Sequence, residues 1–154
     1  MSHPLDSLDR KLLRLLQEDG RIPNVELAER VGLSPTATSE RVKRLTREGI
    51  IAGYGARLDP QKLGRGFLVF VEVTLDKTTP DVFDRFAGAV TRAPDVLECH
   101  LVAGGFDYLI KTRVADMAAY RVFLGEVLLS LPGVRETRTY AVMEEVKATA
   151  SLPV

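Results

Sequence analysis

Residues 33–49 read LSPTATSERVKRLTREG and contain the start and stop signals of one complete helix. Ser34 can accept a hydrogen bond as the N-cap, and Pro35 suits the first helical position because its missing N–H would be unpaired there. Gly49 can take the left-handed conformation that ends a helix. At about 100° per residue, three side chains share one narrow face that we expect to be buried: Thr38, Val42 and Leu45.

A second, shorter helix is expected immediately before this one. Residues 24–32 read NVELAERVG, in which Asn24 can cap the helix and Gly32 can end it. Two helices joined by a tight glycine turn, the second with a basic exposed face, describe a helix-turn-helix whose second helix enters the major groove of DNA. An ordinary helical hairpin with a solvated charged face is the alternative. The Ser-Pro start, the short turn and the basic face together favour DNA binding.

The exposed face of the second helix supplies the candidate DNA contacts. Arg44 and Arg47 point away from the buried face, and Arg41 and Lys43 flank it, which creates the local positive charge that meets phosphates. Thr36, Ala37 and Glu40 are expected nearest to the base edges. The predicted DNA-binding residues are Ser34, Thr36, Ala37, Glu40, Arg41, Lys43, Arg44 and Arg47.

Charge is unevenly distributed along the chain. The 154 residues hold 21 Lys and Arg and 21 Asp and Glu, a net charge of zero at pH 7. Residues 1–65 hold 12 basic and 9 acidic side chains, whereas residues 66–154 hold 9 basic and 12 acidic ones. The basic excess therefore lies in the same half as the helix-turn-helix.

Further elements complete an N-terminal domain. Residues 6–20 carry leucines at helical spacing after a capping Asp6 or Ser7, so we expect a first helix that packs against the helix-turn-helix pair. In residues 50–58, β-forming residues are interrupted by glycines, as in the two short strands of a wing. The sequence predicts a winged helix-turn-helix domain at residues 1–58 and a linker at residues 59–66.

The remaining residues, 67–154, show a different pattern. Strands are expected at 67–75, 96–103, 106–114 and 134–146, with helices starting after Thr79-Pro80 and at Met117. The order strand, helix, strand, strand, helix, strand is that of a ferredoxin-like domain, in which two helices cover one antiparallel sheet. The predicted fold class is α+β, an N-terminal winged helix-turn-helix followed by a C-terminal ferredoxin-like βαββαβ domain.

One face of the predicted sheet is expected to make a protein interface. Apolar side chains fall on the face that the helices leave uncovered: Leu68, Phe70, Val102, Leu109 and Met143. An exposed apolar face of that size usually marks an interface. We therefore expect the second domain to make the protein at least a homodimer.

The sequence offers no catalytic or metal-binding constellation. Glu98, Cys99 and His100 are consecutive, and consecutive strand residues point to opposite faces, so they cannot chelate one ion. Neither a Walker loop nor a dinucleotide fingerprint is present. We expect no enzymatic activity, no metal and no cofactor. Because the apolar runs are too short to span a bilayer and the first residues lack a signal pattern, a cytoplasmic protein without a membrane partner is expected.

Motifs in both halves resemble those of the Lrp/AsnC family of bacterial and archaeal transcriptional regulators. The matching stretches include NVEL at 24–27, VGLSPT at 31–36, LVFVE at 68–72, ECHLV at 98–102, FDYL at 106–109, LPGV at 131–134, TRTY at 137–140 and VMEEVK at 142–147. The resemblance covers nearly the whole chain. It implies a regulator of amino-acid metabolism that binds double-stranded DNA and a small amino acid such as leucine, and dimers that associate further, often into octamers.

The resemblance also implies an amino-acid pocket between subunits, formed around the turn from Gly104 to Asp107. The implied ligand-binding residues are Leu101, Gly104, Gly105, Asp107, Met117, Leu129, Tyr140, Ala141 and Val142. Backbone N–H groups of the two glycines suit a carboxylate, and Asp107 suits an ammonium group. The alternative is that the glycines only turn a hairpin and that Asp107 only caps it.

Two departures from the family pattern leave the regulon open. Gly105 stands where an acidic residue is common, which allows an effector other than leucine, and residues 37–39 differ from the Pro-Cys-Leu segment of a relative's recognition helix. A global leucine regulator and a local activator of a branched-chain, proline or arginine catabolic operon both remain open. A reading of a different class is an amino-acid-binding interaction protein whose helix-turn-helix contacts protein and not DNA.

Overall fold

The computed structural model describes residues 4–154, which form two compact units. One unit extends to Arg57 and also takes in Lys147–Val154, and the other is Leu58–Val146. We expected residues 67–154 to form one domain. The last residues instead join the N-terminal unit, because their backbone hydrogen-bonds to the first helix.

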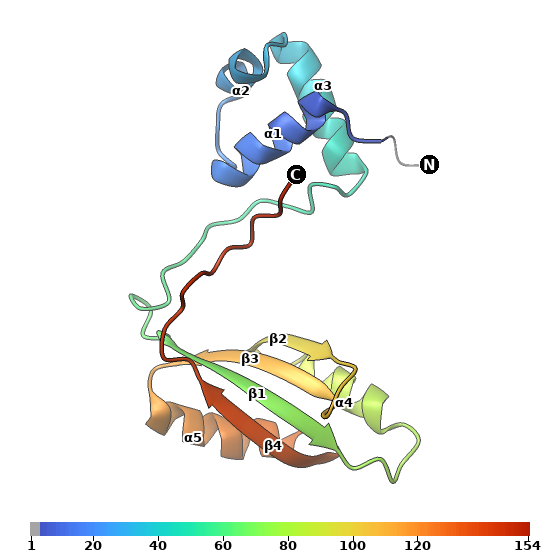
Figure 1. Ribbon diagram of the computed structural model, residues 1–154, viewed down its shortest axis with the longest axis vertical. Coiled ribbons are helices and arrows are strands. Elements are labelled where there is room, and N and C mark those ends of the chain that lie inside the picture. The colour runs from blue at the N-terminus through green and yellow to red at the C-terminus, as the bar shows by residue number, and fades with distance from the viewer. Residues whose placement is uncertain (1–3) are drawn as a thin grey trace. The chain divides into compact units, whose positions relative to one another are not determined.

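Three helices make up the N-terminal unit: α1 (Ser7–Glu18), α2 (Asn24–Val31) and α3 (Pro35–Arg47) (Figure 1). Leu12 and Leu45 are fully buried between them, and Leu27 is nearly so. Ser34 caps α3 as predicted, since its Oγ accepts the Ala37 N–H at 3.2 Å. The expected helix-turn-helix and the additional first helix are thus confirmed.

The ends of α2 and α3 test the predicted caps individually. Gly32 and Gly49 have positive φ angles of 75° and 74°, as predicted for the two helix stops. The predicted Asn24 cap is wrong, because Asn24 is already helical and Pro23 occupies the N-cap position. The Asn24 amide nitrogen instead donates to Pro35 O at 2.9 Å and so links the starts of α2 and α3.

The expected wing strands do not form. Residues 50–58, all of which the structure describes, contain no strand. Gly53 and Gly55 have no side chain to pack, and this segment finds no strand in the described chain with which to pair. The segment between α3 and the second unit is therefore extended chain.

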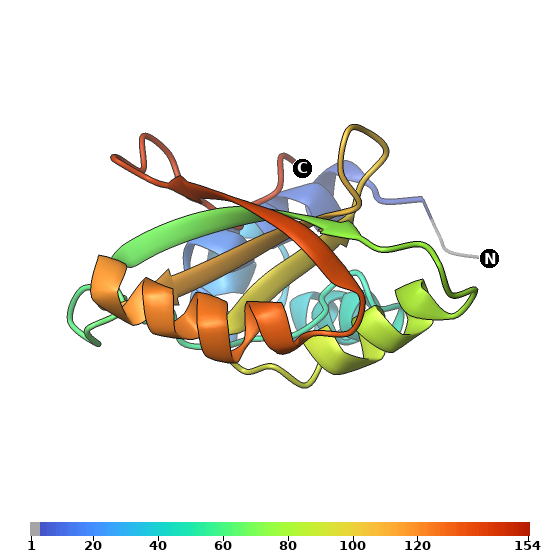
Figure 2. The same ribbon diagram turned by 90° about the horizontal axis from the view of Figure 1, so that it is seen from below.

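The second unit has the predicted ferredoxin-like order. Its sheet runs β2-β3-β1-β4 with all neighbours antiparallel. The strands are β1 (Phe67–Leu75), β2 (Val96–Leu101), β3 (Tyr108–Val114) and β4 (Val134–Ala141), so β2, β3 and β4 are shorter than predicted. The helices α4 (Val82–Val90) and α5 (Met117–Glu126) lie on the same face of this sheet, and a short 3-10 helix, η1 (Leu128–Ser130), follows α5 (Figure 2).

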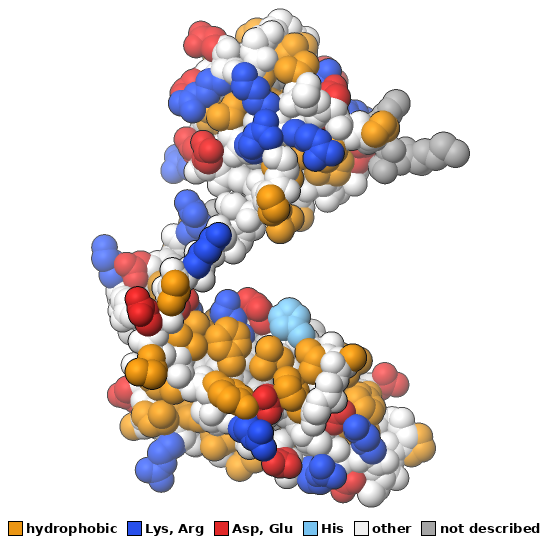
Figure 3. Space-filling view, viewed as in Figure 1, with side chains coloured by type: hydrophobic (Ala, Val, Ile, Leu, Met, Phe, Trp, Pro, Cys, Tyr) orange, Lys and Arg blue, Asp and Glu red, His pale blue; other side chains and the backbone are white. Residues whose placement is uncertain are grey.

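Alternation along β1 separates the two sheet faces. Val69, Val71 and Val73 are fully buried against the helices, where Phe86 and Leu128 complete the core. The intervening residues of β1 point to the face without helices, over which hydrophobic side chains gather together with a few charged ones (Figure 3). None of the helices in residues 4–154 has the length and hydropathy of a membrane-spanning segment.

Candidate nucleic-acid interface and effector pocket

The solvent-facing side of α3 is the candidate nucleic-acid interface. Thr36, Glu40, Lys43 and Arg47 are exposed on it, and Ser34, also exposed, caps the first turn of the helix. Ala37 is half-buried. The arrangement presents two cations and short polar side chains on one surface, and Lys43 lies 3.4 Å from Glu40.

Arg41 lies on the flank of α3, as predicted, but Arg44 lies there too and not on the outward face. Only 29% of the Arg41 side chain and 21% of the Arg44 side chain are exposed, because both turn toward the start of α1. Arg44 Nη2 donates to both carboxylate oxygens of Asp9 at 2.7 Å, and Arg41 Nη1 donates to Asp9 at 2.9 Å and to Asp6 at 2.7 Å. The prediction that Arg44 belongs to the outward face is wrong, since the helical wheel of α3 does not include the packing of α1 against its flank.

Asp6 and Asp9 were not predicted as functional residues. They form a capping box at the start of α1, in which Asp6 accepts the Asp9 N–H at 2.7 Å. Burial alone would raise the pKa of Asp9, but the hydrogen bonds from Arg44 and Arg41 outweigh it and hold that pKa below its usual range. With Arg47 and Glu40, this group lines a cleft of about 500 Å³ beside α3.

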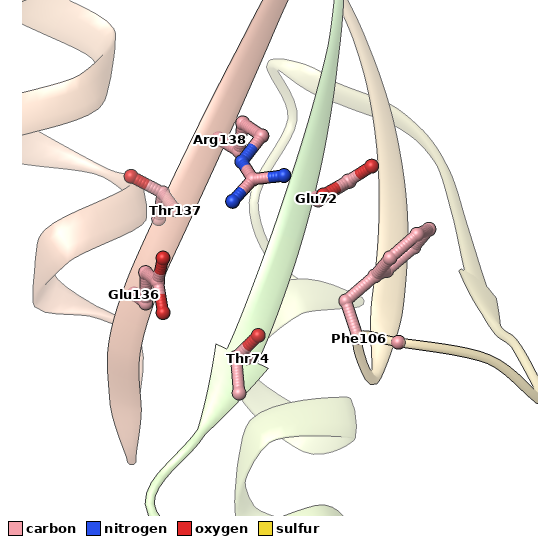
Figure 4. A pocket seen from close by; sticks show the side chains of 7 residues that line it. Glu72, Thr74, Phe106, Glu136, Thr137 and Arg138 are labelled. Atoms are coloured by element: carbon pink, nitrogen blue, oxygen red, sulfur yellow. The ribbon is translucent and has the colours of Figure 1, made fainter.

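A second cleft, of about 300 Å³, opens on the uncovered face of the sheet. Residues from two strands and from the β2–β3 turn line it: Glu72, Thr74, Gly105, Phe106, Glu136, Thr137 and Arg138 (Figure 4). The register places Arg138 of β4 directly opposite Glu72 of β1, and Glu136 opposite Thr74. A hydrogen bond with Tyr140 and the nearby carboxylates of Glu72 and Glu136 raise the pKa of Arg138. One guanidinium and two carboxylates thus line the same cleft as an aromatic ring.

Of the predicted effector residues, only Gly105 lines this cleft. Asp107 is 8% exposed, and its carboxylate already accepts the Leu75 N–H and pairs with Lys77 Nζ, each at 2.8 Å. Burial works to raise the pKa of Asp107, but the bonds from Lys77 and the Leu75 N–H lower it. An effector ammonium group at Asp107 has to share that carboxylate with Lys77.

The other predicted effector residues lie apart within one chain. Tyr140 and Ala141 pair with Phe70 and Val69 in the first half of β1, whereas the Asp107 N–H bonds to Val73 O near its end. Three more are exposed apolar side chains, one at the end of β2 and two in the helical layer: Leu101, Met117 and Leu129. The single chain therefore does not assemble the full predicted set.

Sequence reasoning missed Glu72, Thr74, Glu136 and Arg138, although one signal was available. Glu72 and Thr74 interrupt an apolar strand at a spacing of two, so they share a face. Their pairing with Glu136 and Arg138 depends on a strand register that distant segments set together.

Two family descriptions match the chain. Residues 68–152 match the Lrp/AsnC ligand binding domain, and residues 5–52 match a winged helix-turn-helix DNA-binding family. The leucine-responsive regulatory proteins of Escherichia coli (strain K12) and Salmonella typhimurium are each 60% identical to the chain over 148 residues, which cover 96% of this chain and 90% of the relative.

Solved structures agree in fold and in the type of protein. A transcriptional regulator of Neisseria meningitidis in complex with L-methionine superposes with a TM-score of 0.93 at 41% identity, covering 97% of both chains. A feast or famine regulatory protein of M. tuberculosis complexed with L-methionine gives a TM-score of 0.88 at 34% identity, covering 98% of this chain and 100% of that one.

Proposed function

The chain belongs to the Lrp/AsnC family and is a DNA-binding transcriptional regulator with an amino-acid effector, and we propose that α3 is the helix with which it reads DNA. The observation that carries this proposal is the exposed polar face of α3, where Thr36 and Glu40 precede the cations Lys43 and Arg47. Helix-turn-helix proteins place the first residues of this helix at base edges in the major groove, whereas Lys and Arg neutralise phosphates.

In this proposal the eight predicted DNA-binding residues divide into two groups. Thr36, Ala37 and Glu40 lie nearest to the bases, while Lys43 and Arg47 contact phosphates directly. Ser34 caps and so fixes the first turn, and Arg41 and Arg44 reach phosphates only from the flank that they share with α1.

We propose that the amino-acid effector binds at the cleft on the uncovered sheet face. Arg138 suits the effector carboxylate, the carboxylates of Glu72 and Glu136 suit its ammonium group, and the Phe106 ring offers an apolar contact. The names of the relatives point to leucine, and the ligand of two similar structures points to methionine. A small amino acid with an apolar side chain is therefore the proposed effector.

The proposed assembly is a homodimer that pairs uncovered sheet faces and associates further to an octamer. Apolar side chains gather on that face (Figure 3), and the cross-strand pair of half-buried Phe70 and exposed Tyr140 supports the pairing. In the assembly, neighbouring subunits supply the predicted residues that one chain leaves apart: Leu101, Gly104, Asp107, Met117, Leu129, Tyr140, Ala141 and Val142. A dimer also presents two α3 helices to half-sites about 34–36 Å apart or a multiple of that distance.

We propose that the protein acts in the cytoplasm on genes of amino-acid metabolism and has no enzymatic activity. Footprinting of the protein on the DNA upstream of its own gene, with and without leucine and methionine, tests this function. Protection in two or more segments on one side of the duplex, altered by one of the amino acids, is expected. A protein that binds an amino acid but protects no segment is instead an interaction protein of the alternative class.

A further inference from the structure

Asp9 is the most deeply buried carboxylate of the N-terminal unit, and it lies under the DNA-facing helix. Its side chain is only 1% exposed, and it accepts hydrogen bonds from Arg41 and Arg44, which lie three residues apart in α3. Asp9 Oδ2 also accepts the Asp6 N–H at 3.3 Å, which fixes the Asp9 carboxylate at the start of α1. The Asp9 carboxylate is therefore fixed within α1 and bonded to two arginines of α3.

Each arginine uses only part of its donor set. Arg44 binds Asp9 through Nη2, and Arg41 binds Asp9 and Asp6 through Nη1. Within residues 4–154, Arg44 Nη1 has only a weak contact with Glu48 at 3.6 Å, and Arg41 Nη2 has no hydrogen-bond partner. A guanidinium has five N–H donors in a fixed fork, so each can hold a carboxylate on one side and a phosphate on the other.

The two carboxylates also neutralise the two guanidinium groups. Two of the four cations on α3 are therefore compensated inside the protein, which leaves Lys43 and Arg47 as its outward charges. Buried ion pairs generally add little net stability, because desolvation offsets their attraction. Their main effect in this cluster is on the geometry and the free charge of the arginines.

We infer that Asp9 is a positioning residue for DNA recognition, which holds Arg41 and Arg44 so that their remaining N–H groups face the cleft beside Arg47 as donors for a DNA phosphate. This inference rests on the proposed function of α3. Because the arginines are fixed and neutralised, they bind a phosphate only where the duplex seats in register, and they add little to binding at random sequence. Asp9 thereby raises the ratio of specific to non-specific affinity.

The test compares Asp9→Asn with Asp19→Asn, which makes the same change of charge at the other end of α1, away from α3. Two probes are used, a duplex selected by the parent protein from a random pool and a random duplex of equal length. Fluorescence anisotropy over a range of salt gives both affinities and both salt slopes. Circular dichroism is used to check whether each variant is folded.

For Asp9→Asn we expect tighter binding to random duplex, with a salt slope steeper by about one for each arginine that is released. The ratio of specific to random affinity should fall about tenfold. The released arginines keep their positive charge, but they are no longer held in the geometry that fits only the specific site. Asp19→Asn should keep the ratio of the parent. If Asp9→Asn keeps the ratio and the salt slopes of the parent, whether both affinities fall equally or stay the same, Asp9 has no positioning role and the inference is wrong.

A second variant keeps the test decisive if Asp9→Asn does not fold. Arg44→Lys keeps the charge but lacks the planar fork, so its single ammonium nitrogen cannot reproduce the two-sided geometry by which Arg44 faces Asp9 and a phosphate. Specific affinity should fall about tenfold at nearly unchanged random affinity. If the ratio of specific to random affinity is the same for Arg44→Lys as for the parent, the inference is contradicted. A parent that selects no duplex at all refutes the proposed function itself.

Discussion

Gln17 of α1 and Leu152 near the C-terminus exchange two hydrogen bonds. Gln17 Nε2 donates to Leu152 O at 2.9 Å, and the Leu152 N–H donates to Gln17 Oε1 at 2.7 Å. The side-chain amide thus pairs with the extended chain as a neighbouring strand would. Nearby, Arg14 Nη1 donates to Val154 O at 2.7 Å. The residues after the second unit are therefore fastened to the first.

Gln17→Ala is expected to release this segment. Both bonds disappear, and since the site is open to water, the free energy of unfolding of the helical unit should fall by only about 0.5–1 kcal/mol. The Leu152 amide should exchange its hydrogen several times faster, whereas amides in α2 should not change. Gln61→Ala, in the other unit, is the matched control. Equal exchange of the Leu152 amide in the parent and in Gln17→Ala would contradict the contact.

Thr38→Val is expected to stabilise the protein. Thr38 is fully buried on the inner side of α3, and its Oγ1 finds no hydrogen-bond partner among the described residues. Valine has nearly the same shape without the unpaired hydroxyl, so the free energy of unfolding should rise by about 1 kcal/mol. Thr46→Val is the control, because the Thr46 hydroxyl donates to Val42 O at 2.9 Å in the same helix. Urea unfolding that ranks Thr46→Val above Thr38→Val refutes this reasoning.

Acid should weaken the N-terminal unit through Asp9. The pKa of Asp9 is lower in the folded protein than in the unfolded chain, so its contribution is present above the unfolded pKa and is lost as the pH falls through the folded one. Unfolding followed between pH 6 and 2 should show a loss of stability below about pH 4. Asp9→Asn should be less stable at pH 6 and should vary less with pH. If the free energy of unfolding varies with pH in the same way in the parent and in Asp9→Asn, Asp9 is not a source of the acid sensitivity.

Arg138→Ala is expected to weaken binding of the amino-acid effector. The guanidinium is the only cationic group that lines the sheet-face cleft within the described residues, so its loss should lower the affinity by about tenfold to a hundredfold. Calorimetry with leucine and with methionine measures this on the parent, on Arg138→Ala and on Arg121→Ala, whose side chain is exposed on α5. If Arg121→Ala and Arg138→Ala bind alike, the effector lies elsewhere.

The sequence predicted those features whose causes are local. Ser34 marks the start of α3 and Gly49 its end, as predicted, because a cap and a positive φ angle depend on neighbouring residues alone. The element order of the second unit followed from alternation and helical spacing. By contrast, Arg44 lies on Asp9 because of how α1 packs, and the helical spacing of α3 contains no information about that contact.

The effector cleft shows the same limit at longer range. Glu72 and Arg138 meet through the register of β1 and β4, which the strand sequences do not specify individually. Likewise, the predicted wing of residues 50–58 failed because strand-forming residues need a partner strand, and the described chain provides none there.

Salt-dependent DNA binding of the double variant Lys43→Ala/Arg47→Ala tests the central claim most directly. Both side chains are exposed on the outward face of α3, so their removal should leave the fold intact. If α3 reads DNA, affinity for selected and random duplexes falls together, and the salt slope decreases by about two, one for each phosphate contact that is lost. The same affinity and the same slope as the parent would contradict the assignment of α3 as the DNA-reading helix.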